Sequence, residues 1–225
     1  MGMGPGARLR PPRRFAGVFG VLLAASVLRA EIIDRIAITV ADRVITASQV
    51  DQEVRLTQFQ NHEKLAVTPE EKKKAAGRLV EQALIQRDLE LSHYPLPPQS
   101  DADAPLQALK AEYSGEAEFQ HALEEYGITE ASFHQFLWRQ FTVLRFTDFR
   151  FRPAIQIADS DVQALYQQDV AKWREDGVQP IPALDDVRDR LTQALTEQRL
   201  DAAVDQWLTE TRKQVVIKYH DEALK

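Results

Sequence analysis

The side chains that most often carry metal or acid–base chemistry are scattered singly through this sequence. His62 is followed by a glutamate, as in the zinc-binding pattern HExxH, but no histidine stands four residues after it. The acidic pair Glu70-Glu71 stands where a helix is expected to begin, and the helix dipole and solvation account for it. We expect all five histidines on helix faces or at the surface: His62, His93, His121, His134 and His220.

Other catalytic signatures are missing from the sequence. No cysteine occurs, which excludes disulfides, thiolate catalysis and cysteine metal sites. The patterns of a GxSxG nucleophile, a phosphate-binding P-loop and a dinucleotide-binding loop are absent as well. We therefore expect no enzyme activity, no cofactor and no metal ion. An enzyme would need a set of residues that only the fold brings together.

The first thirty residues have the composition of an export signal. Four arginines and no acidic residue precede an apolar run from Phe15 to Leu28, and a small residue follows at Ala30. This pattern is typical of a secretory signal peptide over residues 1–30. Because the run is shorter than the roughly 20 residues of a membrane span, we expect cleavage after Ala30 and a periplasmic location, with no insertion in the membrane afterwards. Retention of the run as an anchor is the alternative.

The chain without residues 1–30 is strongly acidic. Five arginines lie before residue 31, so 23 of the 28 basic side chains remain against 34 acidic ones, a formal charge of −11. Phosphate groups are repelled by such a charge, so we expect no binding to nucleic acid or to anionic lipid. The remaining length of about 195 residues suffices for one sizeable core.

Amphipathic helical patterns fill most of the chain. The strongest start is Thr68, a capping residue followed by a proline at the first helical position, and this pattern ends at the proline-rich segment 94–98. Ser48 and Ser160 are the expected caps of two more helices. The last helix is expected from about residue 183 to residue 213.

A short β-hairpin precedes these helices. The stretch RIAITVADRVIT, from Arg35 to Thr46, alternates β-branched residues around a turn, and an isolated hairpin is only marginally stable in water. The run from Val215 to Tyr219 is also rich in strand formers and is the expected third strand. The sequence therefore predicts a mainly α protein with a small antiparallel sheet that joins its two ends (α+β). A frayed C-terminal tail is the alternative.

Three stretches of the sequence share one order with a known protein family. They are the hairpin-to-helix passage IAITVADRVITASQVDQEV, the helical pair FQHALEEYGITEASFHQFLWRQFTVLRF and the closing passage LDDVRDRLTQALTEQRLDAAVDQWLTETRKQVVIKY. In order and combination they resemble the SurA family of periplasmic folding chaperones. In that family the N-terminal helical region and a C-terminal helix and strand form one client-binding core. The resemblance thus implies the same closed sheet that the strand pattern predicts.

The chain departs from the family in one respect. SurA-like proteins usually carry parvulin-type prolyl isomerase domains where this chain has only residues 169–182, and a domain needs about 50 residues or more. The resemblance implies a SurA N-like helical chaperone domain over 31–157 and a C-terminal helix and strand over 183–225 that pack back onto it. Residues 158–182 would be a helix and a linker in place of the parvulin domain.

The helix expected from Thr129 to Arg152 carries the candidate client-binding residues. One broad face is apolar, while Trp138, Phe146 and Phe149 fall on the other side, with Arg145 among them. Large aromatic side chains on a second face suit a groove for extended, aromatic-rich segments of unfolded proteins. The alternative is that the long C-terminal helix covers the aromatic residues and that the arginines form a solvated rim.

These observations together predict an ATP-independent periplasmic chaperone of the holdase type, which binds unfolded outer-membrane or other exported proteins. Apolar and aromatic contacts would hide client segments while the acidic exterior keeps the complex soluble. Two alternatives stay open. One is a peptidyl-prolyl isomerase of the parvulin family, and the other is a membrane-anchored assembly factor resembling the PpiD proteins.

Overall fold

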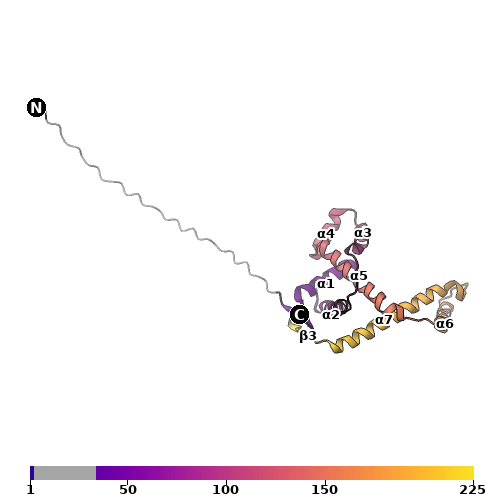
Figure 1. Cartoon of the computed structure of the whole chain (residues 1–225). Coiled ribbons are helices and arrows are strands. Elements are labelled where there is room, and N and C mark those ends of the chain that lie inside the picture. Colours follow the sequence, from indigo (N-terminus) through magenta and orange to yellow (C-terminus); the bar gives the residue numbers. More distant parts are fainter. Residues whose placement is uncertain (3–33) are drawn as a thin grey trace. The chain divides into compact units, whose positions relative to one another are not determined.

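The computed structural model describes residues 1–2 and 34–225 of the chain (Figure 1). The predicted signal peptide, apart from its first two residues, lies outside the described residues. Residues 34–225 form one unit with seven α-helices and a three-stranded antiparallel sheet in that range. The predicted fold class is therefore confirmed.

The two ends of this unit meet in the sheet, whose strand order is β2-β1-β3. Ala41 adopts a left-handed conformation, with φ of 53°, in the tight turn between the first two strands. The third strand pairs antiparallel with the first, so that Ile217 lies opposite Val40. The C-terminal strand thus completes the hairpin as predicted, and the alternative of a frayed tail is wrong. The strands are β1 (Ile36–Val40), β2 (Arg43–Thr46) and β3 (Ile217–Tyr219).

The first helix, α1 (Ala47–Gln60), begins directly after the hairpin. Its cap is Thr46, whose hydroxyl accepts a hydrogen bond from the Gln49 backbone N–H, while the Gln49 side chain accepts one from the Thr46 N–H. The prediction that Ser48 caps this helix is therefore wrong by two residues. Thr46 has the advantage because Gln49 stands three positions later and closes a capping box.

The main core lies between the sheet, α1, α2 (Pro69–Ser92) and the end of α7 (Leu184–Gln214). The helix α2 begins after Thr68 with a proline in its first turn, as predicted. Each large apolar side chain that is fully buried in such a core contributes about 1.5–3 kcal/mol. Buried members from these elements include Ile38, Val40, Ile45, Val50, Val54, Val80, Leu84 and Leu208.

A second core holds the far end of α1 against three further helices. Aromatic rings dominate it, and Phe59 of α1 meets the ring of Phe133 edge to face, with centroids 5.0 Å apart. The three helices are α3 (Asp103–Lys110), α4 (Glu116–Tyr126) and α5 (Glu130–Phe151). Since α5 also packs on α2 and α7, it connects the two cores.

The helix α6 (Asp159–Glu175) packs against α7 and forms a small separate core around Val162, Val187 and Leu191. It begins earlier than predicted. The backbone N–H of Ala158 bonds the Asp161 carboxylate at 3.1 Å, so that Ser160 lies inside the helix instead of capping it. The helix continues to residue 175, which leaves a connection of only residues 176–183 before α7.

The helices of residues 34–225 are too polar to serve as membrane spans. The longest, α7, has 31 residues, and both acidic and basic side chains occur throughout it. Among residues 34–225, no helix is at once long enough and apolar enough to cross a bilayer.

Candidate functional site

Helix α5 carries all four residues predicted to bind clients, and the structure sorts them into two neighbouring cavities. Arg145, Phe146 and Phe149 line a cavity of about 370 Å³ between α5 and the segment that follows α2. We call it the aromatic cavity. Trp138 lines a smaller cavity of about 40 Å³ next to it. The residues that form the walls of the aromatic cavity include Leu89, Tyr94, Pro95, Pro97, Phe146 and Phe149.

Phe146 is a core residue and not an exposed one. Its side chain is 1% exposed and packs on Trp207 of α7, with ring centroids 5.3 Å apart. The prediction of an exposed second face therefore fails at this position, because α7 covers it as the alternative expected. Phe146 contributes only part of the cavity floor, and its ring centroid lies 6.3 Å from that of Tyr94.

Phe149 is the exposed aromatic residue of the site. Its side chain is 61% exposed and meets Tyr94 edge to face, with centroids 4.2 Å apart and an interplanar angle of 89°. Tyr94 follows His93, which ends α2 in a left-handed conformation with φ of 53°. The turn at His93 thus brings Tyr94 to the mouth of the aromatic cavity, where the two rings present an apolar edge to solvent.

Trp138 fixes the proline-rich segment instead of standing free. Its Nε1–H donates a hydrogen bond to the backbone carbonyl of Pro97 at 3.0 Å. The half-buried indole ring also lines the small cavity, together with Leu96. Because Leu89 and Thr142 stand in the walls of both cavities, the two lie next to each other.

Arg145 stands at the rim of the aromatic cavity. Its guanidinium forms an ion pair with Asp101 at 3.2 Å, and its side chain is 65% exposed. This geometry agrees with the solvated rim that was the alternative prediction. Exposed pairs of this kind contribute at most about 1 kcal/mol, so the arginine contributes charge at the rim and little stability.

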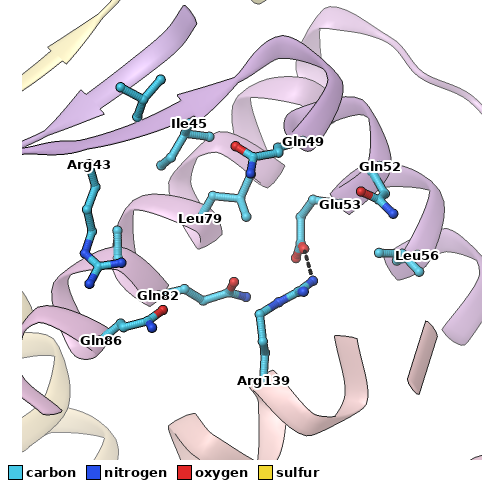
Figure 2. Close-up of a pocket in the computed structure, with 12 residues that line it drawn as sticks. Arg43, Ile45, Gln49, Gln52, Glu53, Leu56, Leu79, Gln82, Gln86 and Arg139 are labelled. Atoms are coloured by element: carbon cyan, nitrogen blue, oxygen red, sulfur yellow. Dashed lines mark ion pairs between the residues drawn. The ribbon is translucent and has the colours of Figure 1, made fainter. Parts of the chain in front are cut away.

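A third cavity, which no sequence pattern indicated, opens between β2, α1, α2 and α5. It has a volume of about 240 Å³, and we call it the polar cavity (Figure 2). Glu53 of α1 and Arg139 of α5 approach each other at its floor, and Gln82 of α2 lies beside them. Four glutamines line its walls: Gln49, Gln52, Gln82 and Gln86.

The floor of the polar cavity is a buried charge cluster. Glu53 is 2% exposed and lies between two guanidinium groups, with Arg78 Nε 3.4 Å from Oε1 and Arg139 Nη2 3.7 Å from Oε2. Burial raises the pKa of the Glu53 carboxyl, although both arginines act to lower it. Burial likewise lowers the pKa of Arg139, against the attraction of Glu53.

Two atoms of this cluster have no hydrogen-bond partner among the described residues. They are Glu53 Oε2 and Arg139 Nε, and leaving a buried polar group unpaired costs about 1–3 kcal/mol. Two other buried carboxylate oxygens also lack a well-directed hydrogen bond, but each has a cation 3.1 Å away, Lys72 for Asp51 and Arg150 for Asp88. The polar cavity is thus the least satisfied polar environment in the described chain.

Sequence reasoning missed Tyr94, Pro95 and Pro97 as part of the aromatic cavity. The prolines predicted a helix end, which is correct, but the same segment also folds back over α5. Sequence reasoning also missed Glu53 and Arg139. The only signal for the aromatic wall is a tyrosine between a helix end and prolines, and the polar cluster has no local signal.

The histidines and acidic residues do not converge on a metal site. Within residues 34–225, no group of three or more such side chains lies close enough to hold a metal ion. Three of the histidines form pairs with single carboxylates, such as His134 with Asp103 at 2.8 Å and His62 with Glu112 at 3.1 Å. His121 and His134 lie on helices α4 and α5, whereas His62 lies in the turn after α1.

No model of a protein family matches the sequence, and no curated protein matches it. The likeness to the SurA family therefore stays a prediction that depends on the order of the three stretches and on the closed sheet.

Proposed function

We propose that this protein is an ATP-independent holdase of the SurA type, which binds unfolded outer-membrane or other exported polypeptides after export to the periplasm. The observation that carries the proposal is the aromatic cavity, where Phe149 is 61% exposed above Tyr94. A large aromatic ring left in solvent beside a concave surface is typical of a site for apolar segments.

The walls of the aromatic cavity support such binding without prior rearrangement. Tyr94 is held between Phe146 and Phe149, and Trp138 ties the proline-rich segment in place through the Pro97 carbonyl. A rigid aromatic surface loses little conformational entropy when an apolar segment docks on it. The few contacts that it offers keep each interaction weak, so that the client can leave again and fold.

The acidic character of the chain suits a holdase. Without residues 1–30 its formal charge is −11, which opposes association between chaperone–client complexes. No nucleotide pattern occurs in the sequence, in agreement with a mechanism that uses binding alone.

The test is suppression of aggregation of an unfolded β-barrel protein, without ATP, by the mature protein and by its Phe149→Ala variant. We expect the wild type to suppress aggregation and the variant to need a severalfold higher concentration for the same effect. The matched control is Leu144→Ala, because Leu144 lies on the same helix, is 53% exposed and does not line the aromatic cavity. If Phe149→Ala suppresses aggregation as well as the wild type and Leu144→Ala do, the assignment of the site is wrong. If the wild type suppresses nothing, the proposed function is wrong.

Two further measurements separate the alternatives. Catalysis of a proline-limited refolding reaction by the wild type would favour a prolyl isomerase. An intact Phe15–Leu28 segment in the mature protein, found by mass spectrometry, would favour a membrane-anchored assembly factor.

A further inference from the structure

The polar cavity has features of a binding site that the proposed holdase contacts do not use. A carboxylate oxygen, Glu53 Oε2, and a guanidinium N–H, Arg139 Nε, both lack hydrogen-bond partners and lie at its floor (Figure 2). Glu53 is 98% buried, since its side chain is only 2% exposed. The floor therefore offers one free acceptor beside one free donor.

The walls of the polar cavity extend this pattern toward solvent. The carboxamides of Gln52, Gln82 and Gln86 form no hydrogen bond within residues 34–225, and Gln52 and Gln86 are exposed. Each carboxamide presents one acceptor and two donor hydrogens. Floor and walls together thus complement a group that donates and accepts at once.

The charges at the floor select a neutral group. Glu53 already faces two guanidinium groups, so a lysine or arginine entering the cavity would meet an excess of positive charge. An entering carboxylate would meet Glu53 Oε2, an acceptor that it cannot satisfy. A primary carboxamide satisfies both free atoms and adds no charge. The cavity, at about 240 Å³, also exceeds the roughly 30 Å³ that one water molecule occupies.

The position of the cavity indicates how such a group arrives. Arg43, Val44 and Ile45 of β2 form one wall, and β2 is an outer strand of the sheet, with no strand of residues 34–225 on its other side. An extended polypeptide can pair with a free strand edge through its backbone, and every second side chain then points to the same face.

We propose that the polar cavity binds the carboxamide of an asparagine or glutamine side chain from an extended polypeptide that lies along the free edge of β2. The inference rests on the proposed function, because it names the class of segment that the client contributes. It adds a polar, sequence-selective contact to the apolar contacts of the aromatic cavity.

Labelled peptides of roughly seven residues, long enough to pair with a short strand, test the proposal by fluorescence anisotropy. They alternate threonine and valine around one central residue, which is glutamine, methionine or glutamate. Methionine has nearly the shape of glutamine without its amide. We expect the glutamine peptide to bind at least tenfold more tightly than either of the others. Equal binding of the glutamine and methionine peptides would mean that only water occupies the cavity, and it would overturn the proposal. Tightest binding of the glutamate peptide would overturn it as well.

A pair of variants assigns the preference to the polar cavity. Arg139→Lys keeps the positive charge but removes the Nε–H, so the preference for glutamine should disappear. Arg150→Lys is the matched control, because Arg150 lies on the same helix with 34% exposure against 33% for Arg139, and its partner is Asp88. Retention of the preference in Arg139→Lys, or its loss in Arg150→Lys as well, would overturn the assignment to this cavity.

The NMR signal of the Arg139 Nε–H gives a second measurement in the wild type. We expect it to shift with the glutamine peptide and to stay in place with the methionine peptide. The outcomes also separate this inference from the holdase function. Absence of the glutamine preference in a protein that still suppresses aggregation would overturn the inference alone. The preference in a protein that suppresses nothing would overturn the holdase function and leave the peptide site standing.

Discussion

The aromatic cavity and the polar cavity are both lined by residues of helix α5, but the first exposes apolar surface and the second buries charged groups. The aromatic cavity exposes apolar surface to water at Phe149, and the backbone carbonyl of its wall residue Pro97 accepts a hydrogen bond from the neighbouring Trp138. The polar cavity buries charge at Glu53 and leaves two atoms without hydrogen bonds. Both arrangements reduce stability relative to a fully covered and fully paired surface, and that cost is concentrated where we propose that ligands bind.

Each cavity provides a different kind of contact. Apolar contact is non-directional and scales with area, so the aromatic cavity accepts many segments with similar strength. Hydrogen bonds at the floor of the polar cavity depend on geometry and on the presence of the right atoms, so that cavity discriminates between side chains. A chaperone with both would hold a broad set of clients and position a subset of them.

Replacement of Phe146 by alanine should give the largest effect. Phe146 is buried under Trp207, so we expect Phe146→Ala to lower the free energy of unfolding by about 3–5 kcal/mol. Phe149→Ala, at 61% exposure, should lower it by less than about 1 kcal/mol. Urea denaturation followed by circular dichroism measures both. Similar losses in the two variants would mean that the aromatic cavity has no division between a structural floor and a free rim.

Removal of Arg139 should have the next largest effect. Arg139→Met leaves Glu53 buried with Arg78 as its only cation. Because Arg78 remains and Arg139 is itself 33% exposed, we expect a loss in the free energy of unfolding of about 2 kcal/mol, below the roughly 3–5 kcal/mol of a fully broken buried pair. The double variant Glu53→Met/Arg139→Met should recover part of this loss, because no charge is then left at the floor. A double variant that is as unstable as the sum of the single ones would show that the two groups do not interact.

The pH dependence of stability should reveal the burial of Glu53. Its raised pKa means that the folded protein keeps the proton at pH values where the unfolded chain has already released it. The contribution of Glu53 to stability is thus greatest below the ordinary pKa of 4.5 and falls as the pH rises through the folded pKa. The difference in the free energy of unfolding between wild type and Glu53→Gln should decline over that window and then stay constant. A flat difference would contradict the raised pKa.

Replacement of Arg145 should give the smallest effect. Its ion pair with Asp101 is exposed on the arginine side, so we expect Arg145→Ala to change the free energy of unfolding by less than about 0.5 kcal/mol. Urea denaturation should give the same small change in the free energy of unfolding at low salt and at high salt. A loss comparable to that of Arg139→Met would show that the rim of the aromatic cavity is structural.

Local patterns were enough to predict most of the fold. Alternating β-branched residues, the cap at Thr68 and the run from Val215 to Tyr219 predicted the hairpin, the start of α2 and the third strand, and all three are confirmed. The prediction of a helix cap failed where two candidate residues compete, as with Thr46 and Ser48. The residue that caps the helix is the one whose backbone N–H also donates a reciprocal hydrogen bond to the side chain three positions later.

The candidate site was predictable only in part. Phe146 and Phe149 stand three residues apart, only about 60° around the helix, and yet one is 1% exposed and the other 61%. The difference arises because α7 covers the first at Trp207 and not the second, which helical periodicity cannot reveal. Glu53, Arg78 and Arg139 come from three helices, so only their tertiary packing brings them together.

The position of β1 between its two neighbours has a consequence for how this molecule is made. A chain that is synthesised or threaded through a membrane from its N-terminus presents β1 and β2 first, whereas Ile217–Tyr219 emerge only after all seven helices of residues 34–225. The backbone groups on one side of β1 therefore stay unpaired until the helices between β2 and β3 have appeared. The sheet is thus completed late in folding. A molecule truncated before Ile217 would leave the edge of β1 exposed to pairing with strands of other molecules.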